Sequence, residues 1–133
     1  MSHENVDVMR KATDAYNRRD KAGWLALTDP DMEVVPPRDW PESARILGRE
    51  ATWNFYVANA EAFGEGLFEL VELIDAGSDS VVAHIRAAMR GKTSDASVSF
   101  SYWSVTTFRN GRGLRAEWFS DRAEALEAVG LSE

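Results

Sequence analysis

The chain has no cysteine and only two histidines among its 133 residues. Without cysteine it can form neither a disulfide nor a thiolate metal site, and it has no cysteine nucleophile. One histidine, His3, lies in the N-terminal tail, so His84 is the only imidazole in the rest of the sequence. Because metal sites need several ligands at suitable spacing, we predict no bound metal, and we expect no other cofactor.

Long apolar runs and an excess of positive charge are also missing. No stretch approaches the roughly 18 apolar residues of a membrane span, and the N-terminus has neither the basic start nor the apolar core of a secretory signal. With 22 acidic and 15 basic residues, the formal net charge is -7, which opposes binding to nucleic acid and anionic lipid. We therefore expect a cytoplasmic protein that binds neither nucleic acid nor membranes.

What remains is the composition of one globular domain. The hydrophobic fraction of 44% and the charged fraction of 28% are ordinary values. A chain of this length typically buries about two thirds of its unfolded surface, enough for one core. The sequence contains no repeat, low-complexity tract or dividing linker, so residues 1–133 are predicted to form a single domain.

The first half of the sequence is dominated by helical periodicity. Apolar residues recur at helical spacing after Ser2, after Asp20 and over Gly48–Phe63, which predicts three helices. A short strand over Met32–Val35 precedes the third helix. The stretch Pro36–Leu47 has no period and is predicted to be a loop.

The second half alternates with the period of two that is typical of strands. Four strands and a closing helix are predicted, over Leu67–Asp75, Ser80–Arg90, Val98–Phe108, Arg112–Phe119 and Asp121–Val129. The dipeptide Asn110-Gly111 is a strong hairpin signal, because both residues tolerate a positive φ. Helices followed by consecutive strands predict an α+β fold, with three N-terminal helices on one face of a mixed, mostly antiparallel sheet.

The strand Val98–Phe108 changes the parity of its apolar residues from even to odd positions. Either a β-bulge or burial of both faces explains this change. We prefer burial of both faces, with the even residues toward the interior and Trp103 and Val105 in an outer apolar patch. Since large exposed apolar patches are unusual on a monomer, we predict a homodimer joined through this part of the sheet.

The even face of the same strand continues with hydroxyl groups where a core strand would carry aliphatic side chains. A polar lining inside an apolar wall predicts a cavity for a small-molecule ligand, and aromatic residues elsewhere suit a flat apolar compound, although each of them also fits a plain core. We assign to this pocket Trp24, Trp40, Trp53, Tyr56, Phe100, Ser104, Thr106, Arg115 and Phe119.

Glu117 is the strongest candidate for a catalytic acid or base. It shares strand parity with Arg115 and Phe119. Apolar walls would oppose the ionisation of its carboxyl group, so that this group could donate and accept a proton near neutral pH. Tyr102 and His84 are the candidate partners, His84 because an imidazole titrates near neutrality. The alternatives are an exposed or ion-paired Glu117 and a structural His84 on an outer strand face.

Several short segments together resemble the SnoaL-like group of the nuclear-transport-factor-two-like superfamily. They are Tyr16–Asp20, Gly48–Ala51 with Phe55-Tyr56, Phe108–Gly111 and Asp121–Leu126. The resemblance covers essentially the whole chain and implies a curved sheet that forms a cone, with three helices enclosing an internal pocket. The superfamily includes isomerases, cyclases, epoxide hydrolases, dehydratases and binding modules, so the resemblance alone does not select a function.

The residues of the steroid-isomerase relatives are mostly replaced in this chain. The position of their general-base aspartate is Val35, that of their oxyanion-stabilising tyrosine is Ala12, and that of their protonated aspartate is Ser104; only Phe55-Tyr56 matches. Steroid isomerisation is therefore not expected. Two functions remain: a cofactor-independent cyclase, isomerase or hydrolase acting on a small hydrophobic substrate with a polar tip, or a non-catalytic ligand-binding or accessory domain.

Overall fold

The computed structural model describes residues 3–37, 45–63, 65–77, 79–90 and 97–131. This part of the chain contains four helices and six strands. In chain order they are α1 (His3–Asn17), α2 (Lys21–Ala26), β1 (Thr28–Val35), β2 (Ile46–Leu47), α3 (Arg49–Phe63), β3 (Glu65–Asp75), β4 (Ser80–Arg90), β5 (Ser97–Arg109), β6 (Arg112–Phe119) and α4 (Arg122–Ala128). Helices precede a run of strands, which confirms the predicted α+β class.

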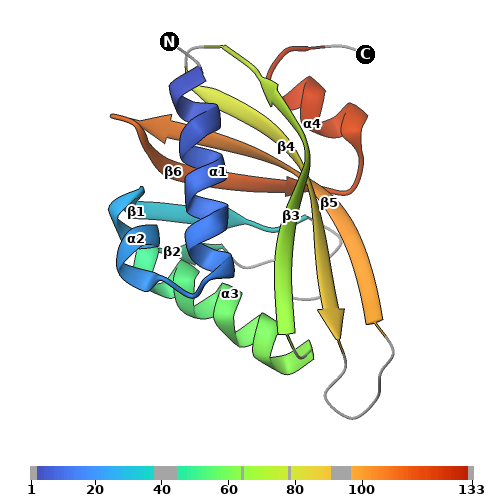
Figure 1. The fold of residues 1–133 in the computed structure, drawn as a ribbon. Coiled ribbons are helices and arrows are strands. Elements are labelled where there is room, and N and C mark those ends of the chain that lie inside the picture. Colours follow the sequence, from blue (N-terminus) through green and yellow to red (C-terminus); the bar gives the residue numbers. More distant parts are fainter. Residues whose placement is uncertain (1–2, 38–44, 64, 78, 91–96, 132–133) are drawn as a thin grey trace.

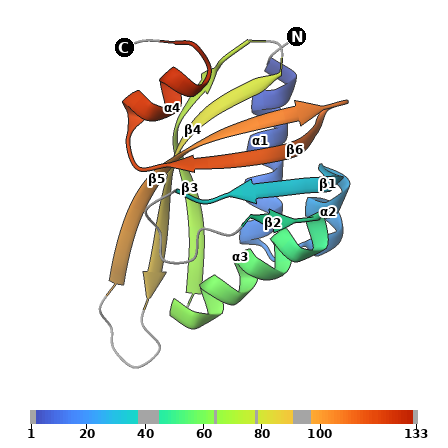
Figure 2. The same ribbon diagram turned by 180° about the vertical axis from the view of Figure 1, so that it is seen from behind.

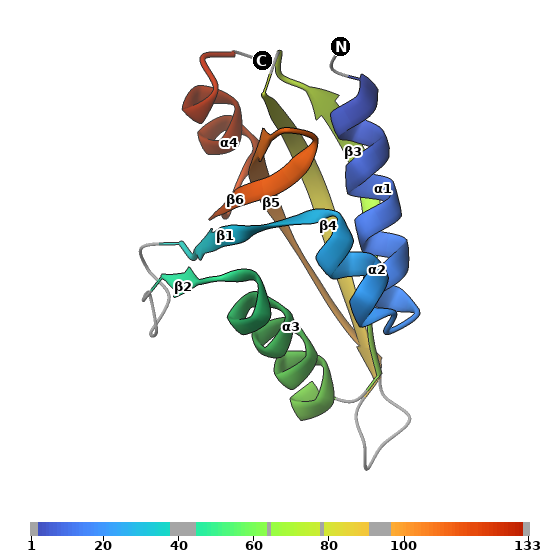
Figure 3. The same ribbon diagram turned by 90° about the vertical axis from the view of Figure 1, so that its left-hand side faces the viewer.

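The strands form one sheet in the order β2-β1-β6-β5-β4-β3. Only β1 and β6 run parallel, and the other neighbouring pairs are antiparallel, so the sheet is mixed as predicted. Helix α1 crosses one face of the sheet and α4 lies against the other (Figures 1 and 2). Seen from the side, the long strands pass between these two helices (Figure 3).

Local signals in the sequence set several of these boundaries. The carboxylate of Asp20 accepts a hydrogen bond from the backbone N–H of Gly23 at 3.0 Å and begins α2, and Asp121 begins α4 in the same way. Such caps satisfy amide groups that have no partner inside the helix. The turn between β5 and β6 has φ values of 54° at Asn110 and 75° at Gly111, so the predicted hairpin turn is correct.

Strand β1 begins earlier than the sequence indicated. It starts at Thr28 rather than Met32, so Pro30 lies inside a strand instead of ending a helix. The strand tolerates this proline because its pairing with β6 is interrupted between Thr28 and Glu33, where no backbone donor is required. At the end of the predicted loop, β2 pairs with β1, while residues 38–44 lie outside the described part of the chain.

Both faces of β5 are buried from Tyr102 to Thr106, as we expected from the change of parity in this strand. Its pairing with β4 runs from Ser97 to Thr107 without a register shift, which rules out a bulge against that neighbour. On the outer face, Trp103 and Val105 are 9% and 7% exposed and pack against Leu126 of α4. The patch that we expected a second subunit to cover is therefore covered by the chain's own C-terminal helix, and the homodimer stays a prediction without this patch to support it.

Strand β6 contains the irregularity that decides which side chains face the interior. The pairs next to the turn end with Phe108 opposite Gly113, and the next pair is Thr107 opposite Arg115, so Leu114 is an extra residue. A one-residue shift of register moves each following side chain to the opposite face of the sheet. Beyond this bulge, the side chains of β6 that strict alternation assigned to the interior lie on the outer face.

Candidate ligand cavity

A cavity of about 90 Å³, partly open to solvent, lies between the inner face of the sheet and the three N-terminal helices. Its lining comes from α1, α2 and α3, from the residue after α2, and from every strand except β2. None of the described residues that line it is acidic, basic or a histidine. The cavity can therefore offer a ligand apolar contact and hydrogen bonds, but no ion pair from these residues.

Most of the polar side chains of this lining carry a hydroxyl group. The residues that carry one are Thr13, Tyr16, Thr28, Tyr56, Tyr102, Ser104 and Thr106. Two of these hydroxyls already bond to the backbone: Tyr16 donates to the carbonyl oxygen of Tyr56 at 3.1 Å, and Thr28 donates to that of Trp24 at 2.8 Å. These bonds fix the positions of the two side chains in the cavity wall.

Aromatic rings form the flat parts of the wall. Trp118 lies between two tyrosines, nearly parallel to Tyr56 at 9° and with its ring centroid 4.6 Å from that of Tyr102. On the side of α1, the ring of Tyr16 stacks on that of Phe68 with a centroid distance of 4.8 Å. Rings held by each other in this way keep their positions and provide a preformed surface for a flat ligand.

The tyrosines of the cavity remain protonated at neutral pH. Burial raises the pKa of Tyr16, Tyr56 and Tyr102, because desolvation disfavours the phenolate. For Tyr102 the pKa lies well above its ordinary value. None of these phenols is therefore a base at neutral pH, and that of Tyr16 already donates its proton to the carbonyl oxygen of Tyr56.

Ser104 is the most deeply buried polar residue of the lining, at 2% exposure. Its side chain is on the inner face of β5, together with those of Tyr102 and Thr106. The buried Oγ has no hydrogen-bond partner in the structure. Because most buried polar atoms in proteins are paired, this hydroxyl is an exception that needs an explanation.

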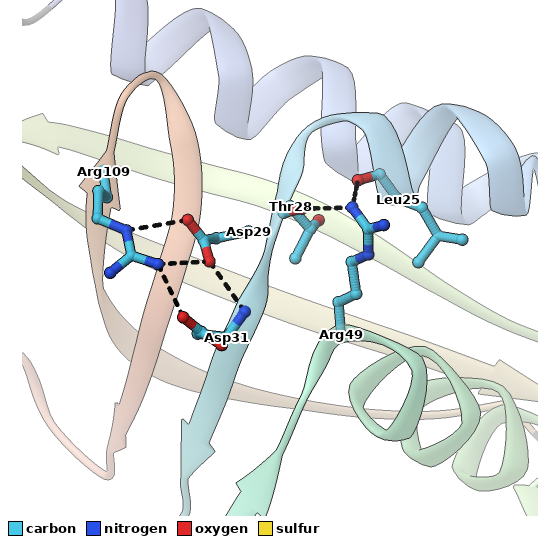
Figure 4. A network of polar contacts seen from close by, with 6 residues as sticks. All are labelled: Leu25, Thr28, Asp29, Asp31, Arg49 and Arg109. Atoms are coloured by element: carbon cyan, nitrogen blue, oxygen red, sulfur yellow. Dashed lines mark hydrogen bonds and ion pairs between the residues drawn. The ribbon is translucent and has the colours of Figure 1, made fainter.

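A group of polar contacts holds the α2–β1 connection, where the cavity wall includes Leu27 and Thr28 (Figure 4). Arg49, the first residue of α3, donates from Nη1 to the carbonyl oxygens of Leu25 at 3.1 Å and Thr28 at 3.2 Å. One guanidinium thus ties the start of α3 to the end of α2 and the start of β1, and so fixes this end of the cavity.

The neighbouring contacts in Figure 4 join the end of β5, next to the β5–β6 turn, to β1. Arg109 donates two hydrogen bonds to the Asp29 carboxylate, at 2.8 and 3.0 Å, and one to Asp31 at 2.9 Å. The bonds from Arg109, with one from the backbone N–H of Asp31, hold the pKa of Asp29 below its ordinary value. This bidentate pair anchors the hairpin in the register that the cavity requires.

Five of the residues that we assigned to the site from the sequence line this cavity. They are Trp24, Tyr56, Tyr102, Ser104 and Thr106. Trp53 instead packs behind the cavity wall, in a core cluster with Tyr16 and Trp24. Trp40 and the side chain of Phe100 lie outside the described residues.

The predicted position of Glu117 in the cavity is wrong. Because of the bulge in β6, Glu117 pairs with Val105 on the outer face, where its side chain is 34% exposed and lies 3.8 Å from the guanidinium of Arg115. Arg115 is also outside the cavity and contacts Glu33 at 3.3 Å. Phe119 packs against the cluster beneath α4. The sequence error was to continue strict alternation from the hairpin turn through β6.

His84 also lies away from the cavity. Its ring stacks on that of Trp103 with a centroid distance of 4.4 Å and an interplanar angle of 3°, on the face of the sheet that α4 covers. The separation of His84 from Tyr102 follows from the β4–β5 register, which pairs Tyr102 with Ile85 and places His84 opposite Trp103. The imidazole therefore cannot act with Tyr102 on a ligand in this cavity.

The large lining side chains that sequence analysis missed include Trp118, Tyr16 and Met32. Trp118 was misplaced because of the bulge, for which Gly113, a glycine inside the strand pattern, was the available signal. The signal for Tyr16 was available, because it follows Met9 and Thr13 at helical spacing on the buried stripe of α1. Met32 alternates with the buried Val34 and could have been placed by strand parity.

No group of three or more acidic residues, histidines or cysteines in the described residues is placed to hold a metal ion. Among the described helices, none has the length and apolar character to cross a membrane.

Comparison with known proteins identifies relatives of this fold. Similar solved structures include TerC, co-crystallised with polyporic acid, with 20% identity, a TM-score of 0.73, and coverage of 95% of this chain and 98% of that one. RV0760c from Mycobacterium tuberculosis, in complex with estradiol-17β-hemisuccinate, has 14% identity, a TM-score of 0.72, and coverage of 92% and 96%. An NTF2-like protein from Burkholderia pseudomallei has 21% identity, a TM-score of 0.71, and coverage of 96% and 98%.

At these identities the structural similarity establishes the fold alone. A search of curated proteins by sequence gives no match. The family model described as the SnoaL-like domain matches residues 9–116, which includes α1 from Met9 onward and the sheet up to Ala116. The chain therefore belongs to the SnoaL-like domain family.

Proposed function

We propose that this protein binds a small, uncharged ring compound in the cavity. The observation that carries the proposal is the lining, which combines seven hydroxyl-bearing side chains with aromatic rings and contains no charged side chain among the described residues. A charged ligand would lose its hydration there without gaining an ion pair, at a cost of several kcal/mol. A neutral ring has less hydration to lose and gains aromatic contact.

Two similar structures support a small organic ligand. TerC was crystallised with polyporic acid and RV0760c with estradiol-17β-hemisuccinate. In this chain the cavity of about 90 Å³ is smaller than the roughly 150 Å³ of a dry cavity that takes up benzene. We therefore expect one ring to enter, with slight movement of the wall, while any larger part of the ligand extends toward the opening.

Titration calorimetry with single-ring probes tests the proposal. Phenol and toluene should bind at millimolar concentration, and benzamide should bind at least tenfold more tightly than benzoate, which has nearly the same shape but carries a charge. Absence of binding by phenol and toluene, or equal binding of benzamide and benzoate, would contradict the proposal.

A cavity-filling variant shows whether the probes bind at this site. Ala12 of α1 lines the cavity, and Ala12→Leu adds three carbon atoms to it while keeping a good helix former. We expect this variant to lose phenol and toluene binding and to remain folded. Ala51→Leu, at an exposed position of α3, is the matched control and should bind both probes as the wild type does. Equal binding by Ala12→Leu would place the probes elsewhere.

Tyr102 supports a second, enzymatic candidate. Its buried phenol keeps its proton at neutral pH, so it can donate a hydrogen bond to a substrate carbonyl oxygen as negative charge develops there. No described residue of the lining is a base, so a water molecule from the open side of the cavity would remove the proton from the neighbouring carbon and carry it away as hydronium. Hydrogen exchange at the methyl group of acetophenone in D₂O, followed by NMR, tests this chemistry. Exchange that is accelerated by the wild type and not by Tyr102→Phe supports an enolisation catalyst. Equal rates with and without protein leave ligand binding as the function.

A further inference from the structure

Ser104 carries a hydroxyl for which the protein provides no partner. Its cross-strand neighbours on the inner face are Ala83 of β4 and Trp118 of β6, and its Oγ is buried without a hydrogen bond. By contrast, the hydroxyl groups of Tyr16 and Thr28 in the same wall both donate hydrogen bonds to backbone carbonyl oxygens. Ser104 therefore carries a buried lining hydroxyl for which the described residues provide no partner.

A buried hydroxyl without a partner destabilises the protein, because it loses its hydrogen bonds to water and gains none in return. Alanine would fill nearly the same space on β5 without this cost. Ser104 therefore destabilises the ligand-free protein. A bound molecule that supplies the missing hydrogen bond removes this cost.

We propose that Ser104 is the specificity-determining residue of the cavity and forms a hydrogen bond with a hydroxyl or carbonyl oxygen of the ligand. The inference rests on the proposed function and narrows its ligand class to neutral rings that carry such an oxygen. Sites that contain a buried polar group discriminate against ligands that leave this group unpaired. Plain hydrocarbons of the same shape bind more weakly for this reason.

Phenol and toluene are the matched probes for this claim, because they differ by a hydroxyl in place of a methyl group. Their dissociation constants are measured by calorimetry for the wild type, Ser104→Ala and Ser101→Ala. Ser101 is exposed on the same strand and serves as the control. In Ser104→Ala, the preference for phenol over toluene should fall about tenfold, while toluene binding is retained. Ser101→Ala should keep the wild-type preference.

Thermal unfolding of the ligand-free proteins separates a ligand-binding role from a structural one. Ser104→Ala should melt roughly 3 °C higher than the wild type, because it removes an unpaired buried hydroxyl, and Ser101→Ala should melt at the wild-type temperature. A lower melting temperature for Ser104→Ala together with weaker binding of both probes would show that the hydroxyl is structural, and would overturn the inference.

The outcomes distinguish this inference from the proposed function. If phenol and toluene bind to the wild type and are excluded by Ala12→Leu, but Ser104→Ala keeps the phenol preference, the cavity binds ligands and the role of Ser104 is wrong. If neither probe binds to the wild type, the proposed function fails and this inference fails with it.

Discussion

The inner and outer faces of one sheet carry opposite kinds of chemistry. On the inner face, Tyr102, Ser104 and Trp118 line a cavity without charged groups. On the outer face, the same two strands carry Trp103 beneath α4, and Glu117 within 3.8 Å of Arg115. Adjacent residues of a strand thus belong to different environments, and the strand register decides which side chains are available to a ligand.

Burial has opposite effects on the two faces as well. The inner face leaves one hydroxyl unpaired and raises the pKa of its tyrosines. The outer face has no such cost at Trp103, whose ring stacks on His84 and is covered by the chain's own α4. This difference supports the proposal that the inner face binds a ligand, whereas the outer face near α4 is part of a hydrophobic core cluster.

The largest expected effect is the loss of a buried tryptophan from either face. Trp103→Ala and Trp118→Ala remove side chains that are 9% and 7% exposed, and each should lower the free energy of unfolding by about 3–5 kcal/mol in urea titrations. Leu47→Ala, at a position 68% exposed, is the control and should have little effect. A loss below about 1 kcal/mol for Trp103→Ala would show that α4 does not cover this residue.

Alkaline pH should destabilise the protein through the inner face. All three tyrosines of the chain line the cavity and have a raised pKa in the folded state. In the unfolded state the tyrosine pKa is near 10, so as the pH rises the unfolded chain loses these protons before the folded protein does. Their contribution to stability is present below about pH 10 and is lost as the pH rises further. Tyrosinate absorbance at 295 nm should therefore appear only together with unfolding. Its appearance near pH 10 in protein that is still folded would contradict the burial of these phenols.

A smaller effect on stability is expected from the contacts that anchor the β5–β6 hairpin to β1. Asp29 has a lowered pKa in the folded state. Its ion pair with Arg109 therefore stabilises the protein above about pH 4, the pKa of an aspartate in the unfolded chain. This stabilisation is lost as the pH falls through the pKa of Asp29 in the folded state. Asp29→Asn should therefore melt below the wild type at pH 7. The difference should shrink as the pH falls below about 4 in melts from pH 7 to pH 2.

Asp31→Asn is the matched control, because this carboxylate is 76% exposed and forms a single bond to Arg109. Its melting temperature should change less than that of Asp29→Asn at pH 7. A difference between wild type and Asp29→Asn that stays constant with pH would show that the aspartate charge is not the cause.

The smallest expected effect belongs to Glu117→Gln on the outer face. The side chain is partly exposed and its ion pair with Arg115 is long, so the free energy of unfolding should change by less than about 0.5 kcal/mol. Phenol binding should also remain at the wild-type level, because the carboxylate is not part of the cavity lining. A tenfold loss of phenol affinity in this variant would show that Glu117 contributes to ligand binding.

The sequence predicted most of the fold because its signals are local. Helix caps such as Asp20 and the Asn110-Gly111 turn act over a few residues, and these predictions agree with the structure. The cavity was harder to predict, because its lining depends on the bulge at Leu114 in β6. Gly113 is a local signal for a bulge but does not say which residue is extra, so the positions of Glu117 and Trp118 could not be read from alternation alone.

The outer patch shows the same limit. Trp103 and Val105 were correctly placed opposite Tyr102, but the sequence did not reveal what covers them. A helix at the end of the chain and a second subunit bury an apolar patch equally well in terms of hydrophobic free energy. Only the position of α4 in the folded chain decides between them for this part of the sheet.

A phenol titration followed by ¹H–¹⁵N NMR tests the central claim, that the ligand binds on the inner face, most directly. The account predicts chemical-shift changes concentrated at the amides of the cavity residues, such as Tyr16, Tyr56 and Ser104, and their disappearance in Ala12→Leu. Changes centred on the far end of the outer face, around α4, or unchanged spectra at millimolar phenol, would contradict it.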